Sequence, residues 1–156
     1  MRTRSRRAKS RPRSSAAIAV QLAARARGAP PPARLRAYAR AAAGGPAQLT
    51  VRIVAAAEAR RLNRTYRRRG HAPNVLAFAY GRAPLSGDIV LCHPVIAREA
   101  RAQGKSLAAH YAHLLVHGVL HLRGRDHARA AHAARMEREE ARILRRLGFG
   151  DPYAVK

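Results

Sequence analysis

Three histidines in the C-terminal third of the chain have the spacing of metal ligands. His117 and His121 are four residues apart, so on a helix their imidazoles lie on the same face and can share one ion. Gly124 follows three residues later, where a left-handed glycine can end the helix and turn His127 toward the same point. Three neutral nitrogens with an open fourth position describe a catalytic zinc, because a structural zinc is closed by four protein ligands. The sequence therefore predicts one Zn²⁺ per chain, held by His117, His121 and His127.

The full pattern, His-x-x-x-His-x-x-Gly-x-x-His, resembles the metal scaffold of the metzincin proteases with one difference. Gly118 stands where those enzymes have a glutamate, which takes a proton from the metal-bound water and gives it to the leaving amine. A glycine can do neither. The sequence therefore predicts a similar metal geometry and disfavours a metalloprotease.

The histidines also have a simpler interpretation, a helix edge with partly buried, hydrogen-bonded imidazoles. The chain has eight histidines, and His110 and His113 fall on the same helical face as His117 and His121. A plain helix gives no reason for a third histidine turned by a glycine, so the metal interpretation is favoured for the trio that includes His127. We expect His110 and His113 to pack or to hydrogen-bond behind the ligands.

The charge of the chain indicates a polyanionic partner. Its 32 Lys and Arg residues and eight Asp and Glu residues give a formal charge of +24, far more than solubility requires. Twenty-nine of the basic residues are arginines, whose planar forks bind phosphate and stack on bases. Nucleic acid is the first candidate. An anionic membrane surface is the alternative, although no apolar run approaches the length of a spanning helix.

Cysteine usage and chain length limit the compartment and the domain count. A single cysteine, Cys92, cannot form an internal disulfide, which favours a reducing, cytoplasmic location, and we expect it to be a buried strand residue. The first 15 residues contain seven Lys or Arg residues and resemble either an organelle transit segment or a basic arm on RNA. We expect a disordered basic tail at residues 1–15 and one domain at residues 16–156.

Local patterns predict an α+β fold. Strands are expected at residues 17–22, 49–54, 74–80 and 88–92, with a turn at 84–87 between the last two. Helices are expected at residues 33–43, 58–67, 95–103, 107–122 and 128–147, the fourth capped by Ser106. Because the 107–122 helix is apolar over much of its surface, we expect it to be central. The predicted fold is a small mixed four-stranded sheet packed with about five helices.

Four further motifs accompany the histidines. They are Leu-Asn-x-x-Tyr-Arg at 62–67, Asn-Val-Leu-Ala-Phe at 74–78, Gly-Asp-Ile-Val at 87–90 and Leu-Gly-Phe-Gly-Asp-Pro-Tyr at 147–153. With them, residues 17–153 resemble the YbeY family of bacterial endoribonucleases and rRNA maturation factors. The chain departs from the usual family pattern at residues 72–73, at Ala77 and at Arg125, none of which is a predicted ligand. The basic tail is also outside that pattern.

The resemblance implies a function and assigns site residues. It implies a zinc-dependent single-strand endoribonuclease that acts in rRNA maturation, at the 3′ end of 16S rRNA, and in ribosome quality control. Its partners would be rRNA of the small ribosomal subunit and ribosomal proteins. The resemblance gives His117, His121 and His127 as zinc ligands and Arg67 as a functional residue. Arg67 is suited to hold the scissile phosphate through paired N–H donors, and the alternative is a plain surface arginine.

The sequence leaves open the attacking group, the class of function and the roles of two aspartates. The attacking group is either a water whose pKa the zinc lowers to roughly 7 or the 2′-hydroxyl of the RNA. A different class of function is a non-catalytic, zinc-containing ribosome assembly factor that binds rRNA or a ribosomal protein. Asp126 can accept a hydrogen bond from a histidine or cap the following helix, and Asp88 can hydrogen-bond near the cleft or end a turn.

Overall fold

A four-stranded mixed sheet forms the centre of the protein. The computed structural model describes residues 16–124 and 130–154. The strands lie in the order β1-β2-β4-β3, and their bounds are Ala16–Leu22 (β1), Ala47–Val54 (β2), Val75–Arg82 (β3) and Leu85–Cys92 (β4). Strands β1, β2 and β4 are parallel, and β3 pairs with β4 in the antiparallel direction at one edge.

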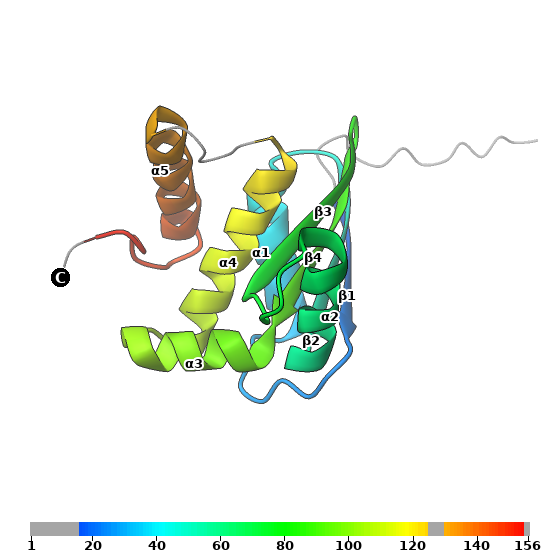
Figure 1. Cartoon of the computed structure of the whole chain (residues 1–156). Coiled ribbons are helices and arrows are strands. Elements are labelled where there is room, and N and C mark those ends of the chain that lie inside the picture. The colour runs from blue at the N-terminus through cyan, green and yellow to red at the C-terminus, as the bar shows by residue number, and fades with distance from the viewer. Residues whose placement is uncertain (1–15, 125–129, 155–156) are drawn as a thin grey trace, which may run out of the picture.

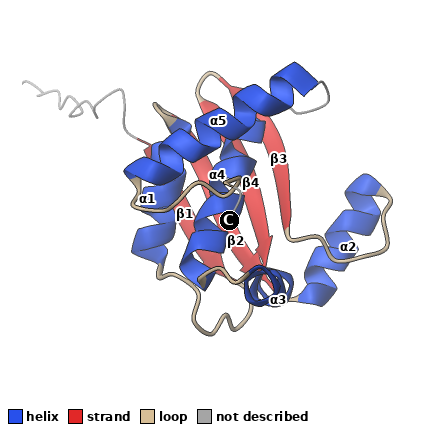
Figure 2. Ribbon diagram, turned by 90° about the vertical axis from the view of Figure 1, so that its left-hand side faces the viewer, coloured by secondary structure: helices blue, strands red, loops and turns tan. Residues whose placement is uncertain are grey.

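Helices cover both faces of this sheet (Figures 1 and 2). The helices in the described residues are Pro32–Ala43 (α1), Ala56–Arg67 (α2), His93–Gln103 (α3), Leu107–Leu122 (α4) and Ala130–Arg146 (α5). Helices α1 and α4 pack together on one face, and α5 packs on the outer side of α4. Helix α2 packs against β4 from the other face, and α3 contacts β4, α2 and α4. The predicted α+β fold is confirmed.

Alternation along the strands separates two hydrophobic cores. Ile89 and Leu91 of β4 belong to the larger core with α1 and α4, whereas Val90 and Cys92 belong to a smaller core with α2. Helix α4 supplies several side chains that are 0% exposed: Tyr111, Leu115, Val116, Val119 and Leu120. The expectation of a central helix is therefore confirmed, as is that of a buried Cys92. No helix among the described residues is long and apolar enough to cross a membrane.

The two ends of α4 follow local sequence signals. The Ser106 hydroxyl accepts a hydrogen bond from the backbone N–H of Ala109 at 3.0 Å, as an N-cap does. At the other end, Gly124 has φ +88°, a left-handed conformation that favours glycine. Both features were predicted. The path from Gly124 to His127 falls on residues 125–129, which lie outside the described residues.

The β3–β4 hairpin is tighter than predicted. Strand β3 continues to Arg82 and β4 begins at Leu85, so the predicted turn at 84–87 was wrong. Gly87 lies inside β4, where an added Cβ would be 2.5 Å from the carbonyl oxygen of Phe78 and 2.9 Å from Cδ1 of Leu122. This glycine permits close packing of the end of α4 on the sheet and does not form the turn.

Candidate metal centre and its hydrogen-bond network

His117 and His121 lie one turn apart on α4, with ring centroids 5.4 Å apart. Both side chains are partly exposed at the edge of an otherwise buried helix. The third predicted ligand, His127, lies outside the described residues. Within the described part of the chain, no group of three or more His, Cys, Asp or Glu side chains is placed to hold a metal ion. The structure therefore brings two of the three predicted ligands together.

Glu140 of α5 is a buried carboxylate that binds His117. It is 0% exposed, and its Oε2 lies 2.6 Å from Nδ1 of His117. Because an ionised carboxylate only accepts hydrogen bonds, Nδ1 of His117 holds a proton, and Nε2 is the nitrogen that could bind a metal ion. Metal-bound histidines commonly have this arrangement, in which a carboxylate fixes the tautomer and the orientation of the ring.

The other oxygen of Glu140 has two further donors. Its Oε1 accepts a hydrogen bond from the Tyr153 hydroxyl and lies 3.3 Å from Nε2 of His113. Burial alone would raise the pKa of the Glu140 carboxyl, but the hydrogen bonds from His113, His117 and Tyr153 outweigh burial and lower it to about 2. Burial and the contact with Glu140 raise the pKa of Tyr153, so its hydroxyl remains a donor. Glu140 is thus a charged group with partners on both oxygens.

Lys105 fixes the tautomers of His110 and His113, which precede His117 on α4. Its Nζ lies 3.3 Å from Nδ1 of His110 and 3.4 Å from Nδ1 of His113. Since an ammonium group only donates, both Nδ1 atoms accept, and both Nε2 atoms hold protons. The Nε2 of His110 points to Oε1 of Glu99 at 2.8 Å, and that of His113 points to Glu140. Both rings therefore have protein partners on each nitrogen, which suits hydrogen bonding rather than metal ligation.

The donor chemistry at this edge of α4 fits a zinc ion. Glu140 occupies Nδ1 of His117, and the ring of His121 lies beside that of His117. Imidazole nitrogen is a common zinc ligand, and a carboxylate hydrogen-bonded behind one ligand is typical of zinc sites. The left-handed Gly124 turns the chain three residues after His121, ahead of the segment that contains His127.

Gly118 is a packing residue. A Cβ at this position would lie 3.1 Å from Cδ1 and 3.3 Å from Cγ2 of Ile89 in β4. The position that has a glutamate in the metzincin pattern therefore faces the sheet in this protein.

Arg67 lies on a different helix from the two histidines. It is the exposed last residue of α2, which packs on the face of the sheet opposite α4 (Figure 1). The preceding residue, Tyr66, is 65% exposed and packs edge-to-face on Phe78 of the edge strand β3, with ring centroids 5.2 Å apart.

The sequence left the roles of Asp88 and Asp126 open, and the structure describes only Asp88. Asp88 lies within β4, where its Oδ2 accepts a hydrogen bond from the Tyr80 hydroxyl at 2.6 Å. It therefore does not end a turn. Asp126 lies outside the described residues.

Sequence reasoning missed Glu140 and gave no role to Tyr153. The signal for Glu140 is its position on the buried side of α5, four residues after Met136 and three before Ile143, both of which are buried. A charged residue on the apolar stripe of a helix requires a partner, and that requirement could have identified it. Tyr153 belongs to the C-terminal motif, whose Asp151 Oδ1 accepts from the Tyr153 backbone N–H at 2.8 Å.

The chain is similar to known proteins in sequence and in fold. The sequence model of the family described as Endoribonuclease YbeY matches residues 34–148. Proteins named Endoribonuclease YbeY from Verminephrobacter eiseniae and Thiobacillus denitrificans are 54% and 55% identical to this chain, over 77% and 78% of its length and 79% and 84% of theirs. The solution structure of TM1509 from Thermotoga maritima matches with a TM-score of 0.53 at 18% identity, covering 88% of this chain and 99% of that one, which supports the fold alone. The chain therefore belongs to the Endoribonuclease YbeY family.

Proposed function

We propose that this protein is a zinc-dependent endoribonuclease that cleaves single-stranded RNA. We propose further that it acts in rRNA maturation, at the 3′ end of 16S rRNA, and in ribosome quality control, with the small ribosomal subunit as its partner. The main observation in support is the pair of adjacent histidines on α4, of which His117 is held by the buried Glu140. Relatives at 54% and 55% identity are named endoribonucleases.

In this proposal His117, His121 and His127 hold the ion. A zinc ion with an open coordination position supplies Lewis-acid activation of a water molecule or of a phosphate oxygen. Glu140 keeps the Nδ1 proton of His117 in place, so that Nε2 stays available as a donor of its lone pair. Gly118 contributes no carboxylate, and its close contact with Ile89 keeps α4 against the sheet.

Arg67 is proposed to bind a phosphate of the RNA. It is exposed, and the ring of its neighbour Tyr66 is exposed beside it at the β3 edge of the sheet. An arginine fork next to an exposed aromatic ring suits a single strand, whose phosphates pair with the guanidinium and whose bases stack on the ring. In this arrangement Arg67 holds the strand as it passes β3.

The test measures zinc content and RNA cleavage in the same preparations. We expect one zinc per chain by elemental analysis, and cleavage of a single-stranded rRNA fragment that stops when a chelator removes the metal. His117→Ala should lose both zinc and cleavage, whereas His71→Ala, which changes an exposed histidine in the loop after α2, should keep both. Full metal occupancy after replacement of all three predicted ligands, or cleavage that is indifferent to chelator, would contradict the proposal.

The same assay examines Arg67. Arg67→Ala should lower cleavage by a few kcal/mol of transition-state stabilisation, on the order of 100-fold, while zinc content and thermal stability stay unchanged. Arg67→Lys should restore only part of the rate, because an ammonium group cannot form the bidentate contact. Arg69→Ala is the matched control, since it removes an equally exposed arginine two residues away. Equal effects at both positions would assign Arg67 to general surface charge.

A non-catalytic ribosome assembly factor is the second candidate, and the charge of +24 is the observation that favours it. Such a protein would bind rRNA without cleaving it, and zinc would serve only the fold. The two candidates differ in one measurement: the assembly factor predicts that wild-type protein and a folded His117→Ala variant bind rRNA equally and that neither cleaves it.

A further inference from the structure

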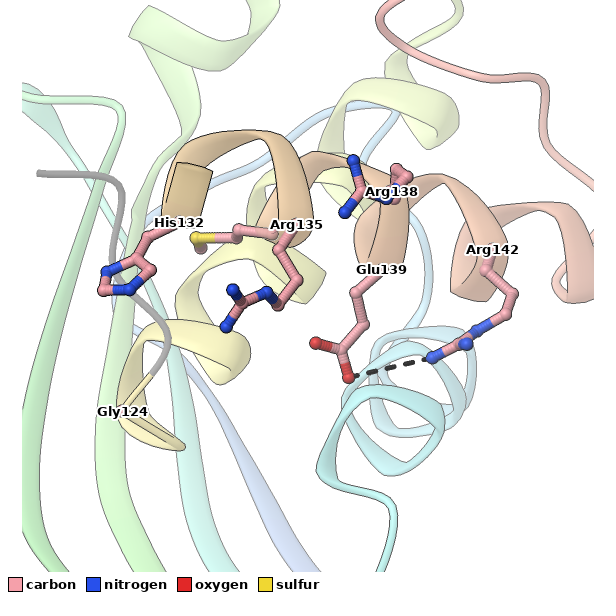
Figure 3. Close-up of a pocket in the computed structure, with 7 residues that line it drawn as sticks. Gly124, His132, Arg135, Arg138, Glu139 and Arg142 are labelled. Atoms are coloured by element: carbon pink, nitrogen blue, oxygen red, sulfur yellow. Dashed lines mark ion pairs between the residues drawn. The ribbon is translucent and has the colours of Figure 1, made fainter. Parts of the chain in front are cut away.

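A cavity of about 760 Å³ lies between α5 and the C-terminal end of α4. Most of its described lining residues are basic or polar, and the full described set is Gly124, His132, Arg135, Met136, Arg138, Glu139 and Arg142. Figure 3 shows the side chains of Arg135, Glu139 and Arg142 extending from the same side of α5. The described lining residues therefore come mainly from one helix, α5, and they are rich in arginine.

Positive charge exceeds negative charge among the described residues that line this cavity. Glu139 is the one acidic residue among its described lining residues, and its Oε2 lies 3.5 Å from Nη1 of Arg123 and 3.9 Å from Nη2 of Arg142. This carboxylate is thus shared between two cations. Arg135 and Arg138 are exposed and form no ion pair with any residue that the structure describes. Their charge is available to an anion from outside the protein.

The cavity also adjoins the candidate metal centre. Gly124, at its wall, is three residues after His121. An added Cβ at Gly124 would lie 2.8 Å from Cζ of Arg82, so the guanidinium at the end of β3 rests against this glycine. Cations from two separate elements, β3 and α5, therefore meet around the residue that ends the metal-binding helix.

We propose that this cavity binds the phosphate backbone of the RNA strand beside the bond to be cut. This inference rests on the proposed function, because it assigns the substrate of that site. Arg135 and Arg142 are seven residues apart, about 10.5 Å along the helix axis, so they can hold separate phosphates of one extended strand. Met136 is the one apolar side chain among the described lining residues, which disfavours a pocket for an apolar ligand. Phosphate contacts position a strand without reading its sequence.

The test uses two double variants on the same helix. Arg135→Gln with Arg142→Gln removes two charges from the cavity. Arg145→Gln with Arg146→Gln removes two charges from exposed positions in the last turn of α5 that do not line it. The probe is a short single-stranded 2′-O-methyl oligoribonucleotide, whose modified 2′ groups cannot attack the backbone. Binding is measured by fluorescence anisotropy over a series of salt concentrations.

We expect the cavity pair to weaken binding roughly tenfold at physiological salt and to reduce the slope of log K against log salt by about 1.4, which corresponds to two phosphate contacts on a single strand. The control pair should change affinity by less than about twofold. Arg82→Gln should also weaken binding, because it removes the cation on the other element at Gly124. Zinc content and melting temperature are measured for each variant, so that a loss of fold is recognised.

Two results would overturn the proposal. Equal weakening by the two double variants would mean that only the total charge matters, and unchanged binding in the cavity pair would mean that these arginines form a solvated helix face. Because the assay measures binding, its result is read separately from the cleavage assay. A protein without zinc or cleavage that still shows the tenfold difference would contradict the proposed function and leave the phosphate site in place.

Discussion

Glu140 determines which nitrogen His117 offers to a metal ion. Glu140→Gln keeps the size of the side chain but replaces one acceptor oxygen by an NH₂ group, so the amide cannot accept from both His117 and Tyr153 as the carboxylate does. We expect the zinc affinity to fall about 10- to 100-fold, the usual cost of losing a group that orients a metal ligand. Competition with a chromophoric chelator measures this dissociation constant directly.

The control for this change is Glu137→Gln, which removes an exposed carboxylate from the same helix and should leave the zinc affinity unchanged. Neutralising a buried carboxylate also removes its desolvation penalty, so thermal stability can move in either direction. The zinc affinity is therefore the deciding measurement. If it stays at the wild-type value in Glu140→Gln, Glu140 serves the packing of α5 and not the metal centre.

At the scale of elements, the contact with the β3–β4 hairpin positions the C-terminal end of α4 on the sheet. Gly87→Ala would place a methyl group 2.5 Å from the backbone oxygen of Phe78 and 2.9 Å from Leu122, and the backbone cannot move away at low cost. Overpacking of this kind typically costs about 1–3 kcal/mol, and each kcal/mol lowers the melting temperature of a domain this size by about 2–4 °C.

Gly70→Ala is the control for this prediction, because nothing lies within 4 Å of the added Cβ and its φ is not left-handed. Calorimetry of both variants measures the difference. Since Leu122 is the last residue of α4, we expect Gly87→Ala to weaken zinc binding as well. Equal melting temperatures for the two variants would show that the sheet adjusts around residue 87.

The elements that could be predicted from sequence are those with local signals. Ser106 and Gly124 bound α4 correctly because a cap hydroxyl and a left-handed glycine act within one turn of the helix. The hairpin was placed wrongly because Gly87 serves a contact with Leu122, a residue far along the chain. Sequence spacing shows which residues share a helix face, and it does not show what another helix brings to that face.

In the candidate site, too, only the residues related by local spacing could be predicted from the sequence. His117 and His121 were predicted together because residues four apart on a helix are neighbours, and their rings do lie side by side. Glu140 and Tyr153 reach His117 and His113 only after α5 and the C-terminal motif dock on α4. The location of Arg67 required the tertiary structure too, because the sheet stands between α2 and α4.

At the scale of the whole molecule, the first 15 residues hold seven of the 32 basic residues. Deleting residues 2–13 removes all seven, so RNA binding should weaken and its salt dependence should become flatter. Zinc content and the cleavage rate at saturating RNA should stay at their wild-type values, because neither depends on the initial capture of the strand. Unchanged affinity and salt slope would instead favour a targeting segment or an inert extension, which a fusion of residues 1–30 to a reporter would distinguish.

The register of the sheet determines where this basic segment joins the domain. Ala16, Ala47, Leu85 and Arg82 pair in one row across the four strands. Three strand spacings separate the two ends of this row, about 14 Å, whereas 15 residues can extend to at most about 50 Å. The segment before Ala16 is thus tethered within easy reach of Arg82 and Gly124. If both places bind RNA, we expect a long RNA to bind the second one intramolecularly, at an effective concentration in the millimolar range. A very short oligonucleotide should gain nothing from the tether.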